Sequence, residues 1–278
     1  MLRKGDLTQG GITGTLLHFT LPMLVGSFLQ QCYNIADTLI VGQCIGAGAL
    51  AAVGSAYTLM VFLISVLLGL AMGSGTVFSL HYGAGNHVAL CRSIFSSFVL
   101  IGIVTLILNV AVFIWLDPIL RLLQVPQDIY GMMRSYLWII FCGIVFTFIY
   151  NFYASLLRAV GDSVTPLWFL AVSVVLNIAL DLFFILQLDW GIQGAAAATV
   201  LAQGVAALGI IIYTYRRRPE LRWHHEDMCF DRTCLKEIAS FSTLTCIQQS
   251  VMNLGILMVQ GLVNSFGNSG KWQLLRQL

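Results

Sequence analysis

The chain has 278 residues, of which 58% are hydrophobic and only 9% are charged, and its mean hydropathy is +0.87. Soluble domains carry about 25% charged residues, so this composition excludes an ordinary soluble domain and indicates a polytopic membrane protein. The net charge of +2 does not indicate any particular class of binding partner. The seven cysteines lack the spacing of a disulfide framework or a zinc site, and we interpret them as small apolar side chains or free thiols.

Long apolar segments predict an all-α fold. A helix needs about 20 residues to cross the hydrocarbon core of a bilayer, and on that criterion the sequence predicts seven membrane spans. They cover residues 14–41, 50–80, 93–115, 132–156, 164–187, 191–215 and 235–266. Pro22 removes one backbone hydrogen bond near the start of the first span, so it predicts a helix kink there.

The basic residues predict the orientation of the chain. With a cytoplasmic N-terminus, only Arg121 and Arg134 fall in extracytoplasmic loops, whereas the run 216–218 and most other basic residues face the cytoplasm. This distribution satisfies the positive-inside rule. We therefore expect a multi-pass protein of the cell (plasma or inner) membrane.

Two of the spans carry polar side chains on one face. In the first span, residues at i, i+3, i+4 and i+7 form such a face: Gln30, Tyr33, Asn34 and Asp37. In the fifth span, Asn177 and Asp181 share a face because they are four residues apart. A carboxylate inside a membrane costs about 2.5–3.5 kcal/mol even on a mild scale. Asp37 and Asp181 therefore predict one cation or proton site between two helices, with purely structural hydrogen bonding as the alternative.

The longest and most charged loop divides the predicted spans into two groups. After it, Gln249 and Asn253 repeat the spacing of Gln30 and Asn34, without the carboxylate. Repeated halves are common in transporters, so the seventh span is interpreted as the first helix of a second, incomplete bundle. The predicted units are a six-helix N-terminal bundle (1–215), a cytoplasmic loop (216–234), that helix (235–267) and an aberrant tail (268–278).

Several segments in combination resemble the MATE family of multidrug and toxic-compound extrusion transporters. They are LPMLVGSFLQQCYNIADTLIVG at 21–42, LAMGSGTVFSLHYGAG at 70–85, LRAVGDSVTP at 157–166, NIALDLFFI at 177–185 and GIQGAAAATVLAQ at 191–203. The resemblance implies a monomeric transporter, not an enzyme, with two six-helix bundles. Such a transporter exchanges inward Na⁺ or H⁺ for outward organic cations and other xenobiotics. It needs the lipid bilayer but no cofactor, no metal beyond Na⁺ and no nucleic acid.

The same resemblance implies a cation site. Family members of one prokaryotic branch use an Asp of the first helix, an Asn and an Asp of the fifth and a Thr of the sixth. The matching positions are Asp37, Asn177, Asp181 and Thr199. Only the family resemblance, and no pattern in the sequence itself, indicates Thr199 as a site residue. Oxygen ligands suit a hard cation, and Gln30, Tyr33 and Asn34 are expected to line the substrate cavity or to couple it to the cation.

Three other interpretations remain open. A related flippase of lipid-linked sugars would need a cationic cavity, whereas no Lys or Arg lies deep in a predicted span. An intramembrane aspartyl protease would carry Tyr-Asp and Gly-x-Gly-Asp motifs, whereas this chain has Ala36-Asp37 and Leu180-Asp181. The third is an inert membrane fragment, because the chain is shorter than two six-helix bundles. We expect a truncated form that does not transport on its own.

Overall fold

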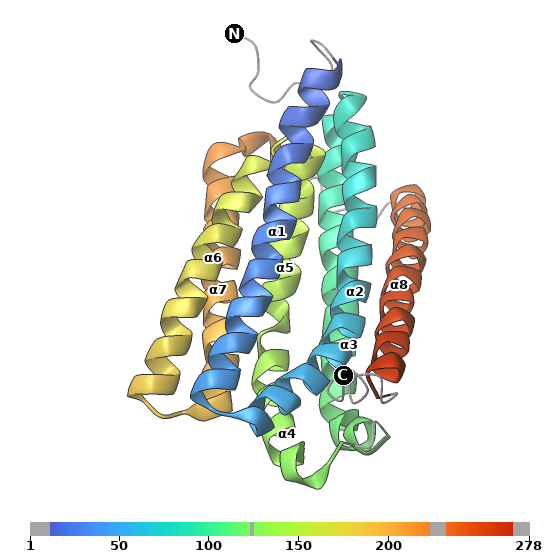
Figure 1. Ribbon diagram of the computed structural model, residues 1–278. Coiled ribbons are helices and arrows are strands. Elements are labelled where there is room, and N and C mark those ends of the chain that lie inside the picture. Colours follow the sequence, from blue (N-terminus) through green and yellow to red (C-terminus); the bar gives the residue numbers. More distant parts are fainter. Residues whose placement is uncertain (1–11, 123–124, 223–231, 269–278) are drawn as a thin grey trace.

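The computed structural model describes residues 12–122, 125–222 and 232–268, and within these ranges it contains helices and no strand (Figure 1). The predicted all-α fold is confirmed. The α-helices are α1 (Ile12–Cys44), α2 (Ala47–Gly83), α3 (His87–Leu122), α4 (Gln127–Cys142), α5 (Ile144–Ala159), α6 (Val164–Leu182), α7 (Gly191–Arg217) and α8 (Arg232–Asn268). A π-helical turn, η1 (Phe183–Gln187), continues α6, and a 3₁₀ turn, η2 (Pro219–Leu221), follows α7. The predicted tail after 268, and residues 223–231 of the predicted loop, lie outside the described residues.

Several of these helices are suited to a lipid bilayer. Within the described ranges, α2, α3, α7 and α6 with η1 are each long and apolar enough to cross a membrane. The helices α4 and α5 meet the same criteria when taken together, with a bend of 47° between them, and count as a fifth crossing if the pair is one broken span. Among the described residues, the helices α1 and α8 are not in this group. The protein is therefore an all-α polytopic membrane protein, and the predicted span 132–156 consists of two helices.

The bend between α4 and α5 lies at Gly143, where α5 meets α7. A Cβ atom at this position would lie 2.5 Å from Cγ2 of Val200, so only a glycine lets the backbone approach α7 so closely. Next to the bend, the carbonyl oxygen of Phe141 accepts a hydrogen bond of 2.9 Å from Nδ2 of Asn109. A side chain of α3 thus stabilises backbone near the break, as membrane-buried backbone requires.

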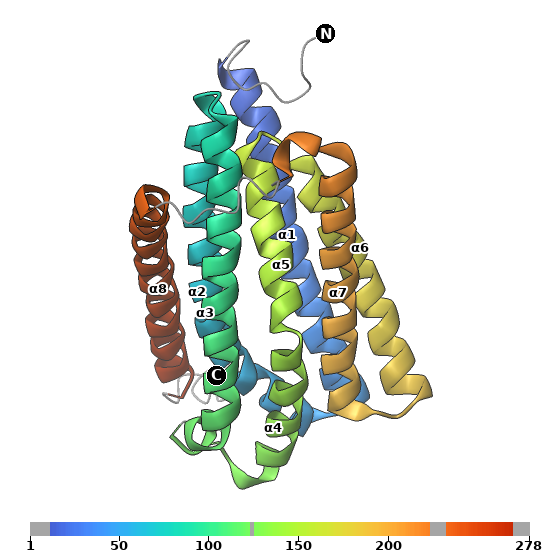
Figure 2. The same cartoon turned by 180° about the vertical axis from the view of Figure 1, so that it is seen from behind.

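The helices pack around two apolar clusters. One joins α1, α2, α4 and the beginning of α7 through residues such as Val41, Leu67 and Phe141, and the other joins α2, α3, α5 and the end of α7 through Phe78 and Phe152. The helix α1 packs chiefly against α6, and α6 packs against α7. The reverse view shows α7 beside α5 and α6, with α8 apart from them (Figure 2). This order places α6 between α1 and α7.

A group of charged residues ties the beginning of α6 to the end of α7. Nη2 of Arg218 lies 3.4 Å from Oδ2 of Asp162, and its Nη1 lies 3.5 Å from Oε1 of Glu220. Burial disfavours the charged guanidinium, but the two carboxylates outweigh that effect and raise the pKa of Arg218 above its usual value. Asp162 also accepts a 3.0 Å bond from the N–H of Thr165 in the first turn of α6. These contacts fix α6 relative to α7.

Candidate functional site

The four predicted site residues meet inside the bundle. Asp37 comes from α1, Asn177 and Asp181 from α6, and Thr199 from α7. All four are buried, with exposed fractions of 9%, 1%, 0% and 6% in that order. They meet because α6 packs between α1 and α7 and because Asn177 and Asp181 lie one helical turn apart on the same face.

Hydrogen bonds connect the members of this site. The hydroxyl groups of Tyr33 and Thr199 lie 3.3 Å apart. The Asn177 amide satisfies two neighbours when its nitrogen donates to Oδ2 of Asp181 over 2.9 Å and its oxygen accepts from the backbone N–H of Thr199 over 3.2 Å. This orientation is assigned from the hydrogen-bond network. It links α6 to α7 and leaves the Thr199 hydroxyl facing Tyr33 of α1.

The two carboxyl groups lie within electrostatic range of each other. Within the described part of the chain, Oδ1 of Asp37 and Oδ1 of Asp181 are buried and have no hydrogen-bond partner. Buried carboxylate oxygens without partners are costly, and either a proton or a cation between them would remove that cost. Two carboxylates, a carboxamide and a hydroxyl are oxygen donors of the kind that hard cations such as Na⁺ prefer.

Only part of the predicted polar face of α1 points into this site. Tyr33 belongs to it, whereas Asn34 is half-buried and donates a 3.2 Å hydrogen bond to Oε1 of Gln31 on its own helix. Gln30 is exposed. The expectation that Gln30 and Asn34 line a substrate cavity therefore stays a prediction. Pro22 lies inside α1, which is continuous from Ile12 to Cys44, so the predicted kink is not a break in the helix.

Tyr136 of α4 is a member of the site that the sequence did not reveal. It is only 4% exposed and lies within electrostatic range of Asp37, Tyr33 and Asp181. Its segment contains many aromatic and aliphatic residues without a polar stripe, so periodicity could not separate it from ordinary core residues. A phenol near two buried carboxylates can donate a hydrogen bond to either of them.

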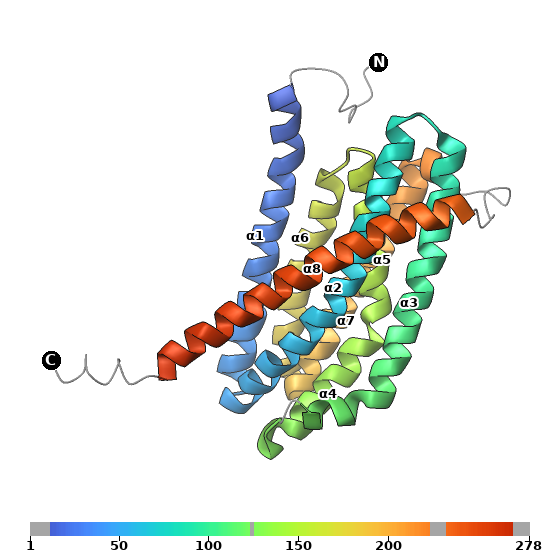
Figure 3. The same ribbon diagram turned by 90° about the vertical axis from the view of Figure 1, so that its right-hand side faces the viewer.

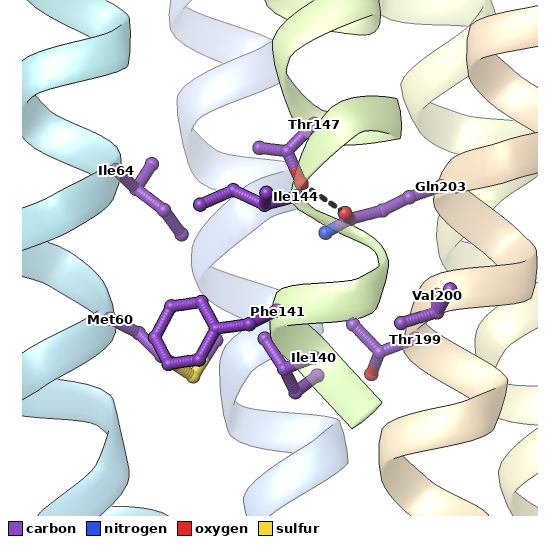
Figure 4. Close-up of a pocket in the computed structure, with 9 residues that line it drawn as sticks. All are labelled: Met60, Ile64, Ile140, Phe141, Ile144, Thr147, Thr199, Val200 and Gln203. Atoms are coloured by element: carbon purple, nitrogen blue, oxygen red, sulfur yellow. Dashed lines mark hydrogen bonds between the residues drawn. The ribbon is translucent and has the colours of Figure 1, made fainter. Parts of the chain in front are cut away.

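A small cavity lies on the other side of Thr199, at the bend between α4 and α5 (Figure 4). Its volume is about 20 Å³, which is close to the ~10–15 Å³ that one water molecule needs. Oγ1 of Thr147 donates a 2.5 Å hydrogen bond to Oε1 of Gln203 at its edge. The lining consists of Met60, Ile64, Ile140, Phe141, Ile144, Thr147, Thr199, Val200 and Gln203. Thr199 therefore borders both the carboxyl site and this cavity.

Comparison with known proteins identifies relatives over most of the chain. The "Probable multidrug resistance protein YpnP" of Bacillus subtilis is 32% identical over 274 residues, covering 96% of this chain and 60% of the relative. A second protein of that organism, "Probable multidrug resistance protein YoeA", is 30% identical over 258 residues, covering 90% and 56%. The chain thus spans about 60% of the length of the curated relatives that it matches.

A solved structure supports the same fold. It is the outward-facing conformation of a multidrug resistance MATE family transporter of the MOP superfamily, with a TM-score of 0.86 and 24% sequence identity. The similarity covers 92% of this chain and 57% of that one. The MatE family model matches residues 22–183, which is more than half of the chain and includes three of the four site residues, Asp37, Asn177 and Asp181. On this evidence the chain belongs to the MATE family.

Proposed function

We propose that this chain provides the cation-binding part of a multidrug efflux transporter. The transporter would exchange inward Na⁺ or H⁺ for outward organic cations and other xenobiotics. The observation that carries the proposal is the buried pair of Asp37 and Asp181, each with one oxygen that has no hydrogen-bond partner. The relatives in Bacillus subtilis are named as probable multidrug resistance proteins, which supports the choice of substrate class.

The packing of α1 supports a mechanism for coupling. This helix packs mainly against α6 and makes few contacts with α2 and α7, so it is the element that can move most readily. Neutralising the carboxylates removes their mutual repulsion and favours the arrangement in which α1 and α6 are close. A cation that binds one arrangement more tightly shifts the population toward it. Substrate release and cation binding are then coupled through α1, where Pro22 weakens the backbone hydrogen bonding.

The units and the topology form part of this proposal. Residues 1–215 would form the N-terminal bundle, with a cytoplasmic N-terminus in the cell membrane, and 235–267 would begin a second bundle. Transport would then require that second bundle, because alternating access moves two bundles against each other. We further propose a monomeric transporter with no cofactor except the coupling ion.

Efflux of a fluorescent organic cation from drug-sensitive cells tests the proposal. The 278-residue chain and the same chain joined to a complete second bundle are compared, each with and without Asp37→Asn. We expect only the extended form to export the dye and Asp37→Asn to abolish export. Asp128→Asn is the matched control, because Asp128 is exposed at the beginning of α4. Full export by the extended Asp37→Asn variant would refute the assigned coupling site.

A further inference from the structure

Two cavities follow one another along the same side of α7. The outer one is a hollow of about 480 Å³ that is open to the surface, and it is lined by Ile139, Asp189, Trp190, Gln193 and Ala197. The inner one is the cavity of about 20 Å³ at the bend between α4 and α5. Apart from Thr199, their lining residues on α7 recur every three or four positions, which places them on one face of the helix. These residues are Gln193, Ala197, Val200 and Gln203.

Residues of α4 line both cavities. Ile139 lines the outer cavity, and the next residue, Ile140, lines the inner one. We call the path between these two helices, from Asp189 to Thr199, the α4–α7 groove. Toward its inner end Val200 packs against the bare backbone of Gly143, since a Cβ atom there would lie 2.5 Å from Cγ2 of Val200. The groove is therefore narrow and apolar beside the inner cavity.

Both ends of the groove attract positive charge. At the outer end, the exposed carboxylate of Asp189 stands beside Trp190, which is 53% exposed and stacks on Phe184 with ring centroids 5.1 Å apart. At the inner end, the Thr199 hydroxyl contacts Tyr33, and beyond it lie the unpartnered oxygens of the Asp37–Asp181 pair. A polar entrance and an acidic destination concentrate cations along a path with low-dielectric walls.

We propose that the α4–α7 groove is the route by which the coupling cation passes between the N-terminal end of α7 and the Asp37–Asp181 site. This inference rests on the proposed function, in whose topology that end of α7 is extracytoplasmic. Asp189 collects the cation and Gln193 lies at the entrance. The inner cavity, with its Thr147–Gln203 hydrogen bond, accommodates one water molecule next to Thr199. Val200 and Gly143 form the barrier between the two cavities.

Cysteine labelling of the whole chain in membranes tests the route without requiring transport. Ala197→Cys lies within the groove, and Leu201→Cys, one helical turn further along, is the control because Leu201 is 50% exposed but lines neither cavity. A membrane-impermeant trimethylammonium methanethiosulfonate is added, and mass spectrometry of peptides reports each cysteine separately. We expect labelling of Ala197→Cys to be about ten-fold or more faster than that of Leu201→Cys, because only the groove admits an aqueous cation.

A second substitution tests the role of the outer carboxylate. Asp189→Asn should slow labelling of Ala197→Cys by the cationic reagent several-fold, more at low than at high salt, and leave labelling by an uncharged reagent of similar size unchanged. Equal rates at positions 197 and 201, or an effect of Asp189→Asn on both reagents alike, would overturn the proposed route.

Radioactive Na⁺ separates this inference from the proposed function. Labelled Ala197→Cys should bind the same amount of ²²Na⁺ as unlabelled protein but exchange it more slowly, because the site is intact and its access is blocked. If Asp37→Asn abolishes ²²Na⁺ binding but Ala197→Cys is not labelled, the assigned cation site is supported and the proposed route through the groove is rejected. If Ala197→Cys is labelled but the extended chain shows no efflux, the access route is supported and the proposed transport function is rejected.

Discussion

At the scale of single residues, the hydroxyl of Thr199 joins the carboxyl site to the inner cavity. Thr199→Val keeps the shape of the side chain but leaves the half-buried Tyr33 hydroxyl without its partner at 3.3 Å, a loss of about 0.5–1.5 kcal/mol for one hydrogen bond. We expect Na⁺ to raise the melting temperature of the wild type and of Thr199→Ser, and to raise that of Thr199→Val much less. Thermal unfolding in detergent, in NaCl against choline chloride, measures this difference.

The matched control is Thr105→Val. The Thr105 hydroxyl is buried and donates only to the carbonyl of Ile101 on its own helix, over 2.7 Å. This substitution should change the melting temperature in both salts equally and leave the Na⁺ effect intact. A full Na⁺ effect in Thr199→Val would show that Thr199 is not a ligand.

The residues of the candidate site differ in how well the sequence predicted them. Asp37 and Asp181 were predictable because a carboxylate in a membrane helix is costly, and Asn177 followed from its place one turn before Asp181. Thr199 required the family resemblance, since threonine hydroxyls in helices are commonly satisfied by their own backbone, as in Thr105. Tyr136 depends on a contact between α4 and the carboxyl pair, which local sequence patterns do not contain.

At the scale of elements, hydropathy predicted where helices occur but not where they bend or end. The predicted spans 50–80 and 93–115 extend in the structure to Ala47–Gly83 and His87–Leu122, because the helical backbone continues beyond the apolar segment. The predicted span 132–156 is bent by 47°. At the bend, Gly143 lies against Val200 of α7, which is far away in the sequence, and a window over neighbouring residues cannot detect such a contact.

Gly143→Ala tests the close contact between α5 and α7 at the bend. The added Cβ atom would lie 2.5 Å from Cγ2 of Val200, and such overpacking costs about 1–3 kcal/mol. We expect a lower free energy of unfolding for Gly143→Ala and recovery of most of the loss when Val200→Ala is added. Gly131→Ala is the control, since nothing lies within 4 Å of its added Cβ atom. Strictly additive effects of the two substitutions in a double-mutant cycle would contradict the proposed contact.

At the scale of the whole molecule, α8 lies across α2 and is separate from the helices of the carboxyl site (Figure 3). The Ser242 hydroxyl donates to the carbonyl of Leu70 over 3.3 Å, and the Cys246 thiol donates to that of Val66 over 3.4 Å. His81 of α2 lies 3.5 Å from Glu237 of α8. The sequence predicted that this helix begins a second unit, but its partner could not be predicted, because the contact depends on close backbone approach rather than on an apolar pattern.

Glycine in α2 permits that approach, which gives the last prediction. A Cβ atom at Gly69 would lie 2.7 Å from Cα of Cys246, whereas nothing lies within 4 Å of one at Gly54. Small residues allow membrane helices to pack closely, so Gly69→Leu should displace α8 and Gly54→Leu should not. The measurement is the rate at which an uncharged maleimide modifies Cys246, which we expect to rise only in Gly69→Leu.

The same variant tests how independent α8 is of the cation site. Because α8 packs on α2 and α3, whereas the carboxyl pair belongs to α1 and α6, Gly69→Leu should keep the increase in melting temperature that Na⁺ produces. Loss of that increase together with displacement of α8 would mean that this helix supports the site through α2. The boundary of the cation-binding unit would then have to include α8.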